Sequence, residues 1–204
     1  TGKTRPIPIR YQLGSCHADQ SQLIPCNISL LTGSNSGGKT MCLLTAAEAL
    51  ILAQMGFPTL GNFEFYPFDE LYYFKKSSGQ ISAGAFETTL LQFVELAQSK
   101  SLKIILADEL ESITEPNAAS KVLAGMFSLL LQNPNNYGIF VTHLVDFLAN
   151  EVESMVKNKM RIDGIEASGL DENLELIVDR SPKFNYIAKS TPELILMRLA
   201  QSGS

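Results

Sequence analysis

A glycine-rich segment, T-G-S-N-S-G-G-K-T at residues 32–40, constrains the fold of this chain more than any other part of the sequence. It has the spacing G-x-x-x-x-G-K-[ST], with Gly33, Gly38, Lys39 and Thr40 at the fixed positions. Such a loop needs glycine because its backbone adopts conformations that are costly for other residues and brings several N–H groups close to a phosphate. The pattern predicts a phosphate-binding loop between a buried strand and a helix.

The helix that follows this loop is expected to add to its affinity for anions. Its N-terminus would point at the phosphate with the positive end of the helix dipole. We expect Lys39 to contact the β- and γ-phosphates and Thr40 to bind magnesium through its hydroxyl. The alternative is a chance glycine turn before a helix. The predicted nucleotide-binding residues of this segment are Gly33, Ser34, Asn35, Ser36, Gly37, Gly38, Lys39, Thr40 and Met41.

A second informative stretch, residues 103–109, is a short apolar run that ends in Asp108 and Glu109. A run that is apolar on both faces predicts a central parallel strand. Acids at its C-terminal end would lie where α/β sheets bind ligands. We expect Asp108 to hold magnesium, directly or through water, and Glu109 to orient or deprotonate an attacking water. The alternative is a pair of surface acids at the end of an ordinary strand.

A third apolar run, residues 137–143, ends in His143. A histidine by itself would more often be structural. At the C-terminal end of a strand beside the acidic one, however, it would be placed to contact the γ-phosphate and report its presence.

Patterns elsewhere predict an α/β fold with a central, mainly parallel sheet and an added antiparallel hairpin. The expected strands are 6–13, 26–32, 71–74, 103–109, 137–143, 156–167 and 173–179, with a turn at 168–172. The expected helices are 39–55, 81–98, 117–132, 184–189 and 192–200.

Four local features of these segments allow more specific predictions, and for Tyr11 and Ser82 two interpretations stay open. Prolines place 6–13 at a sheet edge, and Tyr11 within it either packs or stacks on a nucleotide base. Helix 39–55 is rich in Ala, Leu and Met, so we expect it to be buried on most sides. The eight aromatic residues of 57–74 are interpreted as core and strand packing. Ser82 either caps its helix or forms a second anion site.

The composition limits the class of protein. At 204 residues and 45% hydrophobic, the chain can build one core and a small appendage. Its formal charge is −5 and it has no basic run, so strong DNA binding by this chain alone is not expected. Three cysteines without C-x-x-C spacing indicate neither a disulfide framework nor zinc. The cysteine usage and the lack of a membrane-length apolar stretch predict a cytoplasmic protein, nucleoid-associated if prokaryotic. The abrupt start of the chain is what we expect of a domain excised from a larger protein.

Several of these strings together resemble the ATPase domain of the MutS family of DNA mismatch repair and related MutS-like proteins. T-G-S-N-S-G-G-K-T is similar to that family's T-G-P-N-x-G-G-K-[ST], including Asn35. I-L-A-D-E followed by Thr114 is similar to its L-x-D-E-x-x-x-G-T segment, and V-T-H ending at His143 to its A-T-H switch. The resemblance covers nearly the whole chain.

The resemblance implies an ABC-type phosphate-loop ATPase that hydrolyses ATP to ADP and phosphate with Mg²⁺. Lys39, Glu109 and His143 would be catalytic, and Thr40 and Asp108 would hold the metal. I-S-A-G resembles the L-S-G-G signature of the wider class, so Ser82 would contact the nucleotide of a partner in an ATP-dependent homodimer. Residues 1–183 would form the ATPase domain and 184–204 part of a dimerising helix-turn-helix. DNA would be bound by regions of the parent protein outside this chain.

Two departures from the family pattern keep alternatives open. The family's S-T-F is G-A-F here at 84–86, and Ile113 stands where the family has glycine. One alternative is therefore an ATP-gated dimerisation clamp with negligible turnover. Another is an SMC-like or transporter-type ATPase, although the interval from Lys39 to Asp108 is too short for the helical subdomain of a transporter ATPase.

Overall fold

The computed structural model describes residues 9–14, 26–34, 37–75, 83–110, 115–148, 160–171 and 176–188, with positions 196 and 200. Its elements are β1 (Ile28–Gly33), α1 (Lys39–Gln54), β2 (Glu70–Phe74), α2 (Ala83–Gln98), β3 (Lys103–Asp108), α3 (Pro116–Leu130), β4 (Asn136–Val141), β5 (Met160–Leu170) and β6 (Leu176–Phe184). In the described part of the chain, no helix has the length and apolar character needed to cross a membrane.

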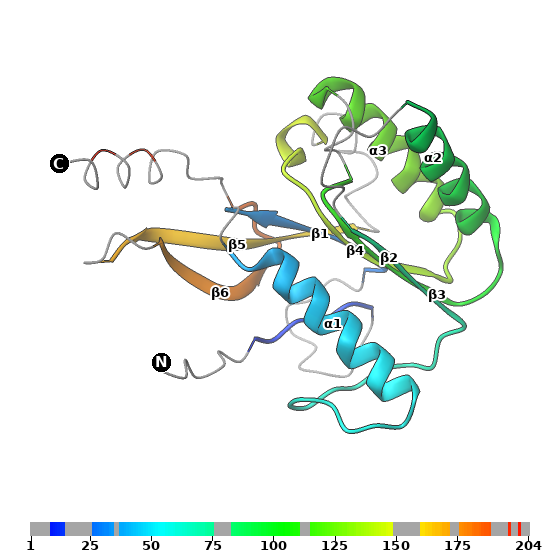
Figure 1. The fold of residues 1–204 in the computed structure, drawn as a ribbon, viewed down its shortest axis with the longest axis horizontal. Coiled ribbons are helices and arrows are strands. Elements are labelled where there is room, and N and C mark those ends of the chain that lie inside the picture. The colour runs from blue at the N-terminus through cyan, green and yellow to red at the C-terminus, as the bar shows by residue number, and fades with distance from the viewer. Residues whose placement is uncertain are drawn as a thin grey trace.

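The strands form one six-stranded sheet in the order β2-β3-β4-β1-β5-β6. Strands β2, β3, β4, β1 and β5 pair in parallel, and β5 pairs with β6 in antiparallel fashion. Figure 1 shows α1 on one side of the sheet and α2 with α3 on the other. The predicted α/β fold, with its mainly parallel sheet and added hairpin, is confirmed.

Strand β1 lies inside this sheet and separates two hydrophobic clusters. Ile28 and Leu30 pack with the side chains of α2 and α3. Leu31 packs on the other face with Leu43 of α1. This alternation explains why the strand carries large apolar side chains on both faces, since each face is covered by a helical layer.

The sheet brings three predicted strand ends to one edge. In the register, Leu31 of β1 lies opposite Val141 of β4, and Val141 lies opposite Asp108 of β3. Because these strands are parallel, the segments that follow them leave the sheet side by side. The glycine loop, the acidic pair and His143 therefore share one edge.

The predicted edge strand at 6–13 is wrong for its described residues, because 9–13 have no strand conformation. A side-chain hydrogen bond and a backbone hydrogen bond hold this segment instead. The hydroxyl of Tyr11 donates to Asp163 Oδ2 at 2.8 Å, and the N–H of Gly14 donates to the carbonyl of Cys26 at 2.8 Å. Tyr11 thus takes the packing role that its sequence position left open.

Helix α1 was expected to be buried on most sides, and this is wrong. Its buried apolar residues, Cys42, Leu43, Ala47 and Leu50, form one face against the sheet. Several large apolar residues of the helix and its end are exposed, namely Met41, Leu44, Ile51, Leu52 and Met55. The abundance of Ala, Leu and Met reflects helix propensity, which does not require burial.

The C-terminal predictions need two corrections. β5 runs to Leu170, so the turn expected at 168–172 was placed too early. The helix expected at 184–189 is wrong for 184–188, because Phe184 ends β6 and the next residues are irregular. Their N–H groups bond to distant residues, that of Tyr186 to the carbonyl of Ile162 and that of Ala188 to Thr32 Oγ1. Most of the helix expected at 192–200 lies outside the described residues. The two positions of this range that are described, 196 and 200, are helical.

Candidate functional site

The loop after β1 is shaped by glycine at two positions. Gly33 has φ 128°, and a Cβ there would lie 2.1 Å from the carbonyl oxygen of Ile165 in β5. Gly38 has φ 89° and ψ 13°, a left-handed conformation directly before α1. Glycine is therefore required at the first position by close approach of β5 and at the second by backbone conformation.

Lys39 places a buried cation at the centre of this loop. The residue is only 3% exposed, and its Nζ donates to the carbonyls of Gly33 and Ser34, each at 2.8 Å. Helix α1, described throughout, has no acidic residue in its first turn to compete for its positive end. A buried ammonium beside a helix N-terminus favours an anion at the mouth of the loop.

Thr40 and Asp108 join the start of α1 to the end of β3. Thr40 Oγ1 donates to Asp108 Oδ2 at 2.9 Å, and Asp108 is 3% exposed. Two buried oxygens here, Asp108 Oδ1 and Ser34 Oγ, have no hydrogen-bond partner among the described residues. A buried oxygen without a hydrogen-bond partner lowers the stability of the folded chain.

The donors present fit magnesium. A hydroxyl and one carboxylate are the hard oxygen ligands that Mg²⁺ takes when substrate phosphates and waters supply the rest. Within the described ranges, no three His, Cys, Asp or Glu side chains gather as a metal cluster. Thr40 and Asp108 offer two protein oxygens, and phosphate and water oxygens would complete the coordination of a cation held by them.

Glu109 and His143 meet at the ends of β3 and β4. His143 Nε2 and Glu109 Oε1 are 2.9 Å apart, and their side chains are 28% and 14% exposed. Glu109 has φ 48°, a left-handed conformation that costs a non-glycine residue about 1–2 kcal/mol. Its N–H donates to the carbonyl of Val141 at 3.0 Å, which holds the backbone in that conformation. The strained backbone and the imidazole together fix the direction of this carboxylate.

A buried polar network supports β1 beneath the loop, and sequence reasoning missed it. Asp163 of β5 accepts hydrogen bonds from Arg161 Nε at 2.8 Å, Ser29 Oγ at 2.6 Å and the Tyr11 hydroxyl at 2.8 Å. The guanidinium carbon of Arg161 lies 4.4 Å from the ring centre of Phe184. Burial, followed by the charge of Asp163, raises the pKa of Tyr11 well above its usual value. Charged residues in the apolar strand β5 were the available signal.

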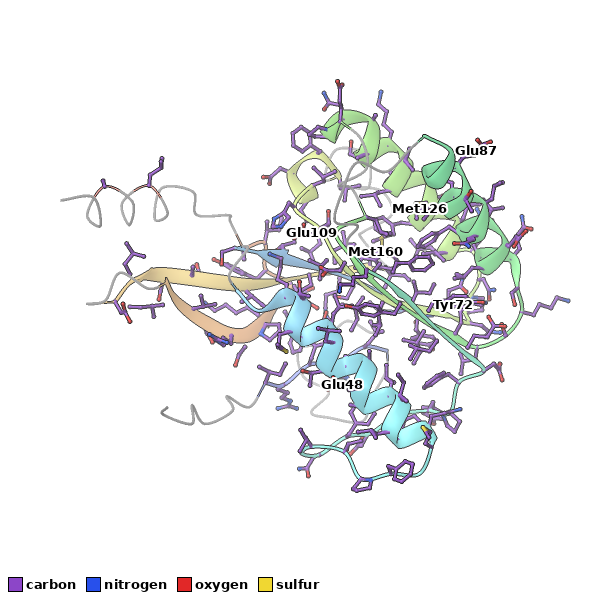
Figure 2. All side chains as sticks on the ribbon, viewed as in Figure 1. Glu48, Tyr72, Glu87, Glu109, Met126 and Met160 are labelled. Carbon is purple, nitrogen blue, oxygen red and sulfur yellow. The ribbon has the colours of Figure 1, made fainter. Side chains whose placement is uncertain are left out.

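The structure brings together most of the predicted site. Gly33, Ser34, Gly37, Gly38, Lys39, Thr40, Asp108, Glu109 and His143 all lie at the edge where β1, β3 and β4 end. Figure 2 labels Glu109 near the N-terminal end of α1, in agreement with the Thr40–Asp108 bond. Met41, in the first turn of α1, is 63% exposed. Asn35, Ser36 and Ser82 lie outside the described residues.

The chain has the class of an α/β protein with a mostly parallel sheet, and the glycines that follow β1 and precede α1 are consistent with a fold of the phosphate-loop type. No protein-family model matches the chain. The chain is 44% identical over 199 residues, 97% of its length, to the "DNA-binding protein MutS2" of Pyrococcus furiosus. It is 30% identical over 159 residues, 74% of its length, to the "Endonuclease MutS2" of Gemmatimonas aurantiaca, and 30% identical over 166 residues, 78% of its length, to that of Streptococcus equi. The chain belongs to the MutS family.

The chain spans only part of these relatives. It covers 34% of the Pyrococcus furiosus protein, 19% of the Gemmatimonas aurantiaca protein and 21% of the Streptococcus equi protein.

Proposed function

We propose that this chain is an ABC-type Mg²⁺-dependent ATPase that serves a MutS-like DNA repair or recombination protein. The observation that carries the proposal is the Thr40–Asp108 hydrogen bond of 2.9 Å beside the buried ammonium of Lys39. A hydroxyl and a carboxylate beside a buried ammonium and a helix N-terminus are the combination that a magnesium–nucleotide complex needs, and this supports the proposal. The names of relatives, which include "DNA-binding protein MutS2" and "Putative DNA mismatch repair protein mutS homolog L359", support the assignment to a process on DNA such as repair.

In this proposal each charged group of the site has a separate task. Lys39 and the loop N–H groups bind the phosphate oxygens and stabilise the charge that develops on them. Thr40 and Asp108 hold Mg²⁺, which when bound neutralises phosphate charge. Glu109 accepts a hydrogen bond, and then the proton, from the attacking water. His143, 2.9 Å from Glu109 Oε1, orients that carboxylate and contacts the γ-phosphate.

We further propose that ATP joins two copies of the chain. By resemblance to the signature of the class, Ser82 of one copy would contact the γ-phosphate bound by the other. Residues 184–204 would then contribute a partial dimerisation element next to the ATPase domain of 1–183. DNA would be engaged by other regions of the parent protein, since this chain carries a net charge of −5.

Nucleotide binding tests this proposal directly. Titration of a fluorescent ATP analogue should give saturable binding to the unaltered chain and a loss of at least tenfold in affinity for Lys39→Ala, because that change removes the cation from the loop. Lys121→Ala is the matched control, since Lys121 is an exposed lysine of α3 on the other side of the sheet. Equal affinity of Lys39→Ala and Lys121→Ala would contradict the assignment of the loop.

A further inference from the structure

Tyr73 lies on the strand next to the acidic one and faces the same side of the sheet as Asp108. In the register of β2 with β3, Tyr73 is opposite Leu106, two residues before Asp108. Residues two apart on a strand share a face, and Tyr73 and Leu106 both pack in the cluster beneath α1. The tyrosine therefore lies in the layer that also contains Thr40.

The hydroxyl of Tyr73 and the second oxygen of Asp108 have complementary needs. Tyr73 Oη and Asp108 Oδ1 are both buried, and neither has a hydrogen-bond partner among the described residues. One is a donor and the other a carboxylate acceptor. Burial, followed by the negative charge of Asp108, raises the pKa of Tyr73, so that the hydroxyl keeps its proton at neutral pH.

The adjacent tyrosine, Tyr72, serves as a comparison because its hydroxyl has a hydrogen-bond partner. Tyr72 packs on the opposite face of the sheet, with the cluster under α2 and α3. Its hydroxyl donates to Glu70 Oε2 at 2.8 Å. The two neighbouring tyrosines thus differ in the place of their hydroxyls. Of the two, only Tyr73 has its hydroxyl buried on the side of the sheet where Thr40 and Asp108 lie.

We infer that Tyr73 is a positioning residue for Asp108, and that its hydroxyl donates through a bridging water to Oδ1. A carboxylate fixed at one oxygen only can still rotate, because its terminal torsion is broad. With Oδ2 bonded to Thr40 and Oδ1 bonded through water to Tyr73, the carboxylate is held in the orientation that Mg²⁺ requires. The inference rests on the proposed function for the cation and adds a residue that sequence reasoning had assigned to packing.

The first test is cation affinity. Mn²⁺, a spectroscopic substitute for Mg²⁺, is titrated into the ADP-saturated chain, and free Mn²⁺ is measured by electron paramagnetic resonance. Loss of an outer-shell partner typically costs about 10–100-fold in metal affinity, so Tyr73→Phe should bind Mn²⁺ at least about tenfold more weakly. Tyr72→Phe should stay within about twofold of the unaltered chain. ADP affinity in EDTA should be unchanged in both variants, because the loop of Lys39 is intact.

The second test needs no nucleotide. In EDTA, Tyr73→Phe should lower the melting temperature of the chain by about 2–4 °C if the hydroxyl is satisfied through Asp108. An unchanged or raised melting temperature would mean that the hydroxyl is an unsatisfied group, and would overturn the inference. So would Mn²⁺ affinity of Tyr73→Phe equal to that of Tyr72→Phe. Failure of the unaltered chain to bind ADP and Mn²⁺ would overturn the proposed function together with this inference, whereas normal binding with no effect of Tyr73→Phe would overturn the inference alone.

Discussion

The hydroxyl of Thr40 donates a hydrogen bond of 2.9 Å to Oδ2 of Asp108, although 68 positions separate the two residues in the sequence. This bond connects the first turn of α1 to the end of β3. The sequence predicts that both residues belong to one magnesium site. Only a parallel arrangement of β1 and β3 on the two sides of β4 brings them within reach.

The left-handed backbone of Glu109 predicts an unusual order of stability. At φ 48° glycine is unstrained, whereas alanine bears a cost of about 1–2 kcal/mol, and the greater entropy of glycine in the unfolded chain offsets about 0.4–1 kcal/mol of this. Glu109→Gly should therefore be more stable than Glu109→Ala by about 0.5–1 kcal/mol in urea unfolding. Higher stability of the alanine variant would show that the backbone relaxes to an ordinary conformation.

Two buried thiols predict a loss of stability at alkaline pH. Burial raises the pKa of Cys26 and of Cys42 from 9.0 to about 11, so the folded chain keeps both thiols neutral where the unfolded chain ionises them. Stability from these groups is fully present below pH 9 and is lost as the pH rises from about 9 to about 11.

The contribution of Cys42 can be isolated by replacing it. Between pH 9 and pH 11, Cys42→Ala should lose less stability than the unaltered chain, by about 1–2 kcal/mol, since one pKa unit corresponds to ~1.4 kcal/mol. Urea unfolding at a series of pH values measures this difference. Parallel curves for the two proteins would contradict the expected pKa of Cys42.

Replacing the carboxylate of Glu109 should trap the ATP-bound dimer. Glu109→Gln keeps the size of the side chain and an acceptor oxygen but removes the group that takes a proton from water. We expect light scattering to give about twice the chain mass of 22.3 kDa with Mg-ATP and the single-chain mass with Mg-ADP. Glu48→Gln, on the exposed side of α1, is the control and should not trap a dimer. A single-chain mass in both nucleotides would argue against ATP-driven association.

Weak DNA binding is expected of the isolated chain. Its net charge is −5, and non-specific affinity for DNA comes mainly from lysine and arginine contacts that release counterions. A gel-shift titration with duplex DNA at physiological salt should show no binding below micromolar concentration. Submicromolar binding would place a DNA contact within this chain rather than elsewhere in its parent.

The strands around the site could be predicted because their signals are local. β1, β3 and β4 are apolar on both faces and end in residues of distinct chemistry, and parallel pairing then brings those ends to one edge. The spacing of Gly33, Gly38 and Lys39 likewise predicted the loop from a short stretch of sequence, although the need for glycine at position 33 comes from the close approach of Ile165 in β5. The pairing of His143 with Glu109 was not foreseen, although their neighbouring strand ends were.

The parts that could not be predicted depend on distant partners. The segment at 186–188 has a helix-like composition, but the N–H of Ala188 bonds to Thr32 Oγ1, 156 positions away. The hydroxyl of Tyr11 similarly bonds to Asp163 across 152 positions, so its segment packs without joining the sheet. Which face of α1 is buried depended on the position of the helix on the sheet, which composition does not determine.

The rate of ATP hydrolysis with and without Mg²⁺, measured for the unaltered chain and for Asp108→Asn, tests the central claim most directly. The change to asparagine keeps an acceptor for Thr40 but removes the charge that holds the cation, and Asp179→Asn, at an exposed position of β6, is the control. We expect Mg²⁺-dependent release of phosphate by the unaltered chain and by Asp179→Asn, and a rate at least about 100-fold lower for Asp108→Asn. Equal rates in Mg²⁺ and EDTA, or full activity of Asp108→Asn, would contradict a magnesium–ATP site at the Thr40–Asp108 pair.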